Sequence, residues 1–138
     1  MIININEKEK LQNNKAYQEY LKENPSTGYL KVRATSLNEA MPIEGVNIIV
    51  SKKIGDDTII FYEGKTDVSG MINDIKLPTP IRVSNNEEVP NFSTYNLRAI
   101  YEKDNFDKTY DISLCCSITI VQYINVIPSV TMEDLNGN

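Results

Sequence analysis

The stretch with the densest set of reactive side chains is residues 64–70, GKTDVSG, which holds two hydroxyls and a carboxylate between flanking glycines. A serine nucleophile needs a base such as histidine to take its proton, and the chain contains no histidine. Asp67 can instead accept a hydrogen bond from the backbone two residues on, and Gly70 can adopt the positive φ that ends such a turn. The stretch therefore predicts a hairpin turn rather than a reactive loop.

Acidic residues form three further groups that could act as acid–base pairs or metal ligands. They are the adjacent pairs Asp56–Asp57 and Glu87–Glu88, and the series Asp104, Asp107 and Asp111. Glycoside hydrolysis needs two carboxylates about 5–9.5 Å apart in a cleft, which adjacent residues in polar loops do not indicate. Calcium loops place oxygen ligands at alternate positions and include a glycine, whereas the aspartate series has no glycine and is interrupted by Phe106. We expect no catalytic residues, no metal and no cofactor, and hence a protein that is not an enzyme.

Two candidates for covalent chemistry remain. Cys115 and Cys116 are adjacent, which strains a disulfide between them, and in a strand they would point to opposite faces. With no histidine and no CxxC motif, we expect free thiols rather than a zinc site. Lys31 and Asn125 could form an intramolecular isopeptide bond, as in some bacterial surface sandwiches, although strand alternation turns Lys31 outward. Both candidates stay open as alternatives.

Composition restricts the classes of partner. The 138 residues carry a formal charge of −5, with a pI near 4.8, and the basic residues are scattered, which argues against nucleic acid as a partner. No stretch approaches the roughly 20 apolar residues that span a membrane. The N-terminal sequence MIININEKEK has neither a basic leader nor a sustained apolar segment, so we expect a protein made in the cytoplasm without a signal peptide.

Residues 1–27 differ in composition from the rest of the chain and predict a short amphipathic helix. Asn6 followed three residues later by Glu9 predicts the N-cap, and the sequence NPSTG at 24–28 predicts the end. The apolar stripe is narrow, which indicates an N-terminal helical arm that docks on its own domain or on another subunit. The candidate partner-binding residues of this arm are Tyr17, Tyr20 and Leu21.

From Gly28 onward, apolar and polar residues alternate as they do in half-buried strands. Seven strands are predicted, at residues 29–36, 46–53, 58–63, 71–77, 93–102, 109–114 and 117–127. Short strands with turn residues between them indicate an all-β fold, a seven-stranded antiparallel immunoglobulin-like or transthyretin-like β-sandwich over residues 28–128. The proline-rich residues 78–91 predict an ordered loop, and residues 129–138 predict a flexible tail.

The order of these segments resembles the carboxypeptidase-regulatory-like, transthyretin-like modules of bacterial proteins. The matching segments are GYLKVRA, then MPIEGVNIIVS with Pro42 and Gly45, then FYEGKTDVSG. The later segments IKLPTP, PNFSTYNLRA and ITIVQYINVIPS resemble the N-terminal domain of bacterial spore cortex-lytic enzymes. The resemblance covers residues 28–128 and implies the fold and a role in docking, shielding or positioning. It carries over no activity, because the hydrolase region of the large family members is not matched.

These expectations together favour a non-catalytic structural or interaction module, a subunit or decoration protein of a phage, phage-tail-like or spore surface assembly. Its partners would be other proteins or copies of itself, bound through the N-terminal arm, and its final location a virion, phage-tail-like particle or spore layer. The alternative is a binding or pro-domain-like module for cell-wall peptidoglycan or for a cortex-lytic hydrolase partner. That alternative expects exposed aromatic residues beside the 78–91 loop, with Phe92 and Tyr95 as candidates.

Overall fold

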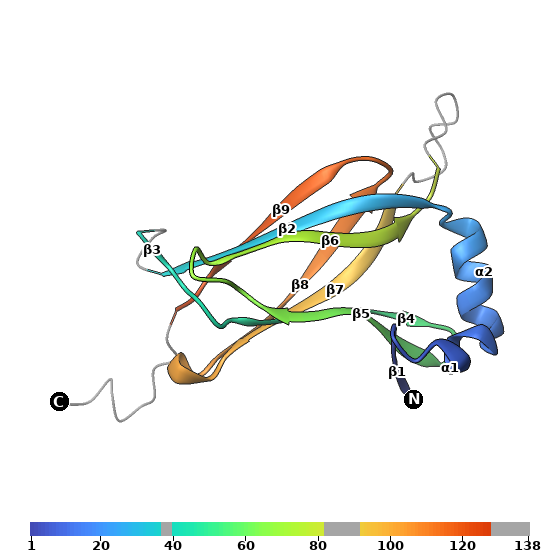
Figure 1. Cartoon of the computed structure of the whole chain (residues 1–138), viewed down its shortest axis with the longest axis horizontal. Coiled ribbons are helices and arrows are strands. Elements are labelled where there is room, and N and C mark those ends of the chain that lie inside the picture. The colour runs from blue at the N-terminus through green and yellow to red at the C-terminus, as the bar shows by residue number, and fades with distance from the viewer. Residues whose placement is uncertain (37–39, 82–91, 128–138) are drawn as a thin grey trace.

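The computed structural model describes residues 1–36, 40–81 and 92–127, and it shows two β-sheets packed face to face with two short helices at one end (Figure 1). The first sheet has the strand order β1-β5-β4-β7-β8. Its strands are β1 (Ile2–Asn4), β4 (Asn47–Ile54), β5 (Asp57–Lys65), β7 (Phe92–Tyr101) and β8 (Phe106–Cys115). The 3₁₀ helix η1 (Glu102–Asp104) joins β7 to β8.

The second sheet is built around the long strand β2 (Ser26–Ser36). β2 pairs antiparallel with β6 (Met71–Thr79) and, near its end, with β3 (Met41–Pro42). On the side away from β6, it pairs in parallel with β9 (Thr119–Asn125). The pairing of β1 with β5 is also parallel, so the sandwich is antiparallel except at these two places.

The core between the sheets is formed by the inward-facing residue of each alternating pair. Leu30 and Val32 of β2 and Ile48 and Val50 of β4 belong to this core, and all four are fully buried. The other strands contribute buried aliphatic residues in the same alternation, namely Ile59, Ile72, Ile75, Leu77, Leu97, Ala99, Ile112, Leu114 and Ile124. This core confirms the β-sandwich that the period-two pattern predicts.

The predicted turn in residues 64–70 is confirmed. Asp67 Oδ1 accepts hydrogen bonds from the backbone N–H groups of Ser69 and Met71, at 2.9 Å each. Gly70 has a φ of +73°, which a residue with a Cβ adopts only with strain. The hydroxyl of Thr66 donates to the carbonyl of Ile43 at 2.7 Å and is thereby used in the fold.

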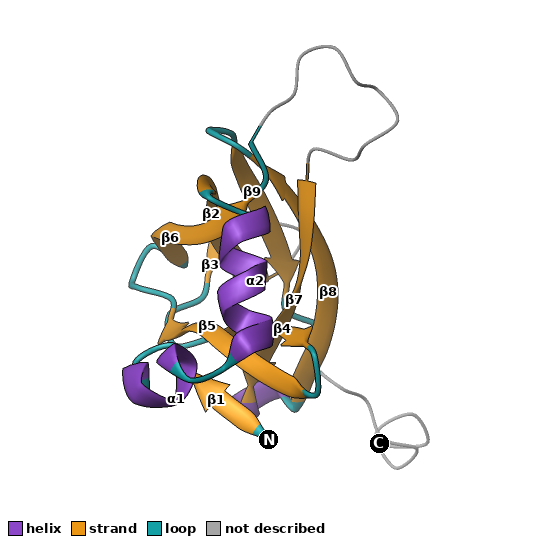
Figure 2. Ribbon diagram, turned by 90° about the vertical axis from the view of Figure 1, so that its right-hand side faces the viewer, coloured by secondary structure: helices purple, strands orange, loops and turns teal. Residues whose placement is uncertain are grey.

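The N-terminal segment forms two helices, α1 (Lys8–Gln12) and α2 (Lys15–Glu23), of which α2 lies across one end of the sandwich (Figure 2). The predicted N-cap at Asn6 is wrong, because α1 begins at Lys8 and its N-cap is Glu7, which makes no side-chain cap bond. The helical segment also breaks at Asn13 and Asn14 into two pieces. α2 begins at Asn14, whose Oδ1 accepts the N–H of Tyr17 at 3.0 Å.

The number of strands and one boundary differ from the sequence-based prediction. The described residues form nine strands rather than seven, because β1 and β3 have only three and two residues and carry no readable alternation. Pro78 and Thr79 are the last residues of β6 and not the start of a loop. The rest of that predicted loop beyond residue 81, with Glu87 and Glu88, and the predicted tail at 129–138 lie outside the described residues.

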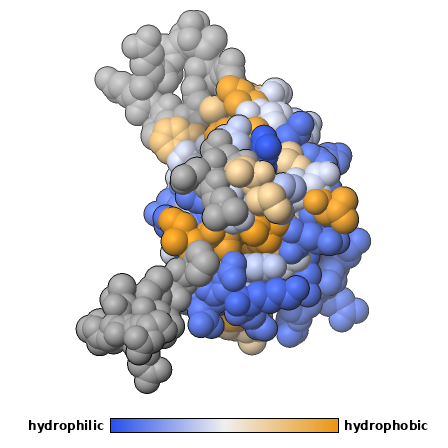
Figure 3. Space-filling model, turned by 90° about the vertical axis from the view of Figure 1, so that its left-hand side faces the viewer, coloured by the Kyte–Doolittle hydropathy of each residue, from blue (hydrophilic) through white to orange (hydrophobic). Residues whose placement is uncertain are grey.

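The end of the sandwich opposite α2 carries several exposed apolar side chains among polar ones (Figure 3). Met41 of β3, Val68 of the β5–β6 turn and Ile127 after β9 are all more than half exposed.

Neither helix in the described ranges is long and apolar enough to cross a membrane.

Candidate functional site

The largest aromatic cluster lies where α2 covers the end of the sandwich. Tyr20 of α2 stands edge-on to Tyr95 of β7, with ring centroids 6.5 Å apart, and Phe61 of β5 lies 5.3 Å from Tyr95. Tyr17, one turn earlier in α2, packs 6.3 Å from Phe61. The hydroxyl of Tyr20 donates to the hydroxyl of Tyr95 at 2.7 Å, and Tyr95 donates to the carbonyl of Pro78 at 2.5 Å.

Lys52 of β4 occupies an inward-facing position beside these rings. Val50 before it and Ile54 after it are buried on the same face of the strand. Its Nζ lies 5.6 Å from the ring centroid of Tyr20 and 5.6 Å from that of Tyr95. The same nitrogen donates to the carbonyl of Thr94 at 2.7 Å. A single amine is therefore held by two aromatic faces and one backbone acceptor.

Burial shifts the proton affinities of this cluster in a consistent way. Loss of water around the ammonium lowers the pKa of Lys52, which increases the share of the neutral amine. Burial raises the pKa of Tyr20 and, more strongly, that of Tyr95, where the hydrogen bond with Tyr20 adds to the effect. Both phenols therefore stay neutral over the physiological range, and Lys52 is the group in the cluster whose charge is easiest to remove.

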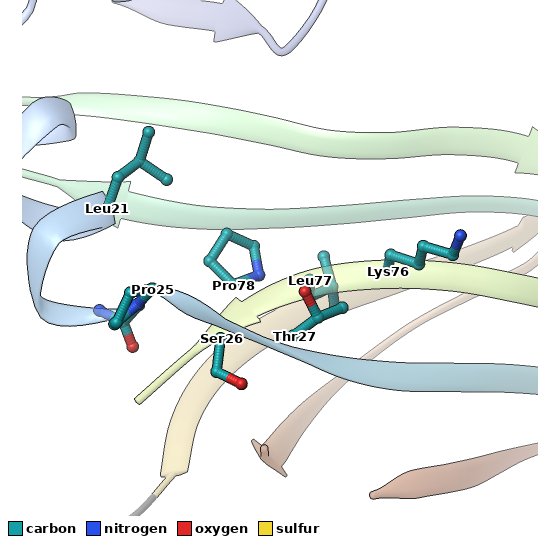
Figure 4. Close-up of a pocket in the computed structure, with 8 residues that line it drawn as sticks. Leu21, Pro25, Ser26, Thr27, Lys76, Leu77 and Pro78 are labelled. Atoms are coloured by element: carbon teal, nitrogen blue, oxygen red, sulfur yellow. The ribbon is translucent and has the colours of Figure 1, made fainter. Parts of the chain in front are cut away.

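A pocket of about 370 Å³ lies between the end of α2, the start of β2 and β6 (Figure 4). Leu21 of α2 forms one side, the segment that joins α2 to β2 forms the next, and β6 closes it. The lining residues are Leu21, Asn24, Pro25, Ser26, Thr27, Lys76, Leu77 and Pro78. The walls combine apolar side chains with an amide, two hydroxyls and an ammonium group, which suits a small polar molecule.

Two residues that line the pocket are hydrogen-bonded to Tyr95 and to Ser93, which lies two residues before it in β7. The carbonyl of Pro78, a lining residue, accepts the hydroxyl of Tyr95. The side chain of Asn24, also a lining residue, accepts a hydrogen bond from Ser93, the neighbour of the residue whose carbonyl binds Lys52. A molecule in the pocket would thus lie against residues bonded to Tyr95 and Ser93, whereas Lys52 is not among the residues that line the pocket.

The residues predicted to bind a partner fall into two groups. Tyr17 and Tyr95 are only 7% and 1% exposed and pack within the chain. Tyr20 is half-buried against them, and Leu21 lines the pocket. Phe92, at the start of β7, is 49% exposed and does not join the cluster. A role of these five residues in binding another molecule stays a prediction.

The sequence-based reading did not single out Lys52, although a signal was present. In VNIIVSKKI, the positions of Val46, Ile48, Val50 and Ile54 share one face, and Lys52 is the charged residue on that face. Lys53, its neighbour, points outward and is exposed. A charged residue at an inward position of a strand is rare unless it has partners.

The other candidate residues do not form a site in the described parts of the chain. Asp107 makes an exposed ion pair with Arg98, with Asp107 Oδ2 2.6 Å from Arg98 Nη2. No group of three or more Cys, Asp or Glu side chains in those parts could hold a metal ion. Cys115 and Cys116 are not disulfide-bonded, and Cys116 Sγ accepts a hydrogen bond from Ser26 at 3.1 Å.

The register of β2 and β9 separates the pair proposed for an isopeptide bond. Lys31 lies beside Val121, and Asn125 lies beside Thr35. The two side chains are therefore four residues apart along adjacent strands, about 13 Å at the usual rise of a strand. That distance exceeds the reach of a direct bond.

Comparison with known proteins identifies the fold as transthyretin-like. The 5-hydroxyisourate hydrolase of Klebsiella pneumoniae superposes with a TM-score of 0.51 at 16% sequence identity, over 75% of this chain and 92% of that chain. An (S)-allantoin synthase superposes with a TM-score of 0.54 at 11% identity, over 77% of this chain and 42% of that chain. No family model matches the sequence, and no curated protein sequence matches it. At these identities the likeness establishes the fold.

Two expectations from the sequence are corrected by this comparison. The expected non-catalytic module, whether a phage, phage-tail or spore subunit or a wall-binding domain, is contradicted, because the two solved structures described above are enzymes. The expectation that the chain is not an enzyme is contradicted by the same finding, since both of these similar structures are enzymes. That expectation was based on the lack of histidine and of paired carboxylates, and it left out the inward-facing Lys52.

Proposed function

We propose that this chain is an enzyme that acts on the carbonyl group of a small polar molecule at the α2 end of the sandwich, with Lys52 as the reactive amine. The observation that carries the proposal is the inward position of Lys52 between the rings of Tyr20 and Tyr95. The pocket at the same end of the sandwich, whose lining residue Pro78 is bonded to Tyr95, would receive the molecule. The use of the same fold by a hydrolase and a synthase supports a catalytic role.

The chain has few alternatives for reaction chemistry near neutral pH. It contains no histidine, the side chain that ordinarily exchanges protons in this range. A lysine whose pKa is lowered by burial is a well-established nucleophile toward carbonyl compounds. Lys52 meets that condition, since burial lowers the pKa of its ammonium group.

The proposed step is imine formation. The lone pair of the neutral Nζ adds to the carbonyl carbon, the carbonyl π electrons move to the oxygen, and a proton passes from nitrogen to that oxygen. Loss of water then gives the imine, and addition of water reverses the step. The carbonyl of Thr94 holds Nζ in place, and Tyr20 and Tyr95 limit its motion from two sides.

Reductive trapping tests the proposal. The protein is treated with a limiting amount of acetaldehyde and cyanoborohydride between pH 6 and 10, and each lysine is quantified by peptide mass mapping. We expect Lys52 to reach half-maximal labelling at a lower pH than Lys53, its exposed neighbour.

Turnover of small aldehydes and ketones, screened on the same protein, should disappear in Lys52→Arg and persist in the matched variant Lys53→Arg. Equal labelling midpoints for the two lysines, or turnover that survives Lys52→Arg, would overturn the proposal.

We also propose that residues 28–128 share ancestry with the N-terminal domain of bacterial spore cortex-lytic enzymes. The support is the order of the segments from GYLKVRA to ITIVQYINVIPS. This proposal concerns descent and not function. An experimental structure of such a domain should show the parallel pairing of its last strand with the strand equivalent to β2, and an antiparallel last strand would contradict it.

A further inference from the structure

Strand β9 ends the second sheet with an open edge in the described part of the chain. It pairs with β2 over seven residues, from Tyr29↔Thr119 to Thr35↔Asn125, and with no other described strand. The N–H of Tyr29 donates to the carbonyl of Ile118, and the N–H of Val126 donates to the carbonyl of Thr35. Along a parallel strand, the N–H and C=O groups of every second residue point to the same neighbour. The groups of Ile118 and Val126 point to β2, so those of Val121 and Tyr123, at the alternate positions, point away from it.

The outer face beside this edge is apolar on β9 and basic on β2. Val121 is 39% and Tyr123 54% exposed. The register places Lys31 next to Val121 and Arg33 next to Tyr123. Lys76 of β6 extends the basic residues across the sheet, beside Tyr29 of β2. None of these three cations forms an ion pair with a described residue.

The concentration of positive charge on this face contrasts with the rest of the molecule, whose formal charge is −5. β6 contributes one exposed cation, Lys76, and one exposed acid, Asp74, both on the side of β2 away from β9, so the cations nearest the open edge are Lys31 and Arg33 of β2. Residues 119–125 of β9 carry no charged side chain. The charges nearest the open edge are therefore the cations of the neighbouring strand β2. A partner at this edge is attracted by the face if it is acidic and repelled if it is basic.

We infer that an acidic, extended peptide segment of another protein adds to the edge of β9 as a further strand. The outward N–H and C=O groups of Val121 and Tyr123 would pair with its backbone. The backbone of the added strand would lie about 10 Å from that of β2, because β9 stands between them and each strand spacing is about 5 Å. Alternate side chains of the added strand would lie on the same face of the sheet as Lys31 and Arg33. Lysine and arginine side chains span that distance toward a glutamate, so alternate glutamates would face Lys31 and Arg33.

A second copy of β9 fits this edge less well than an acidic strand. Paired antiparallel, it would present only Thr119, Val121, Tyr123 and Asn125 to the face, and none of these side chains is negative. The cations of β2 would then remain without a partner. The inference does not depend on the site at Lys52, which lies at the α2 end of the sandwich.

The test uses a capped peptide that alternates glutamate with threonine and valine, and a control peptide with glutamine in place of each glutamate. Amide hydrogen exchange is followed by NMR on the full chain. We expect the acidic peptide to slow exchange at Val121 and Tyr123, whose N–H groups point outward, and to leave Ile120 and Gln122 unchanged. Affinity should fall with added salt.

Charge variants complete the test. Lys31→Glu with Arg33→Glu should weaken binding of the acidic peptide by about tenfold or more. The milder Lys31→Gln with Arg33→Gln guards against misfolding and should have a smaller effect in the same direction. Lys53→Glu, on the outer face of the other sheet, should leave binding unchanged. Equal binding of the two peptides would overturn the inference. The inference would also be overturned if an acidic polysaccharide bound as tightly as the acidic peptide without slowing amide hydrogen exchange at Val121 and Tyr123.

Discussion

The two phenols under α2 differ in whether a backbone carbonyl depends on them. Tyr20 donates to Tyr95 and also interacts with the Ser93 hydroxyl. Tyr95, in contrast, accepts from Tyr20 and donates to the carbonyl of Pro78. Tyr20→Phe removes bonds between side chains only and should lower the free energy of unfolding by about 0.5–1.5 kcal/mol. Tyr95→Phe also leaves the Pro78 carbonyl without its donor and should cost about 1–3 kcal/mol.

Urea denaturation of both variants measures this difference. Tyr123→Phe provides the control, since this side chain is 54% exposed and should lose almost no stability. An equal loss for Tyr20→Phe and Tyr95→Phe would show that the bond to Pro78 contributes nothing.

Burial of these phenols also sets a pH dependence. Because the pKa values of Tyr20 and Tyr95 are raised in the folded chain, their stabilising contribution is fully present below the unfolded-state pKa, about 10. It is lost as the pH rises above that value, since the unfolded state releases its protons first. We expect the free energy of unfolding to fall between about pH 10 and 11, and to fall less in the Tyr95→Phe variant.

Lys52 acts in the opposite direction. Its pKa is lowered on folding, so its contribution to stability increases as the pH rises from that lowered pKa toward its unfolded value, about 10.4. Lys52→Met removes this amine, so in the variant the free energy of unfolding should fall more steeply with pH above about pH 10. A decline with the same slope in this variant would show that the pKa of Lys52 does not change on folding. Circular dichroism melts at each pH provide the measurement.

At the scale of the elements, two turn glycines with similar backbone angles provide a matched pair. Gly45 and Gly70 have φ values of +87° and +73°. A Cβ at Gly45 would meet no atom within 4 Å, whereas one at Gly70 would clash with the carbonyl oxygen of Ala34. Gly45→Ala should cost only the strain of positive φ, about 1–2 kcal/mol. Gly70→Ala should cost about 1–3 kcal/mol more through overpacking. Equal midpoints in thermal melts would contradict the clash.

The elements also show what the sequence could predict. The seven longer strands were predictable because each keeps one buried face, as in Leu97 and Ala99 of β7. β1 and β3 were not, since two or three residues cannot show a period. The parallel pairing of β9 with β2 joins segments about ninety residues apart, and alternation within one strand contains no information about its partner.

The candidate site was predictable only in part, for a related reason. Alternation in β4 places Lys52 on the inward face, so its unusual position could be read from residues 46–54. The rings of Tyr20 and Tyr95 that surround it come from α2 and β7, which local patterns do not bring together. Tyr17 and Tyr20 were predicted to be anchors for a partner, but the contacts they make in the structure are with their own sandwich.

At the scale of the whole molecule, the N-terminal segment completes the core. β1 extends the first sheet beyond β5, and α2 covers the rings of Phe61 and Tyr95. Three side chains of this segment belong to the buried core, namely Ile3, Leu11 and Tyr17. Burial of a large apolar side chain contributes about 1.5–3 kcal/mol, and a domain of this size is stable by only about 5–15 kcal/mol.

Deletion of residues 1–24 should therefore lower the free energy of unfolding by several kcal/mol and expose apolar surface. The expected readouts are a lower urea midpoint and increased binding of an apolar dye. Lys22→Ala, an exposed position of α2, is the control for changes in this helix that leave the core intact. If residues 1–24 were an independent arm, the truncated chain would unfold at the same urea concentration as the full chain.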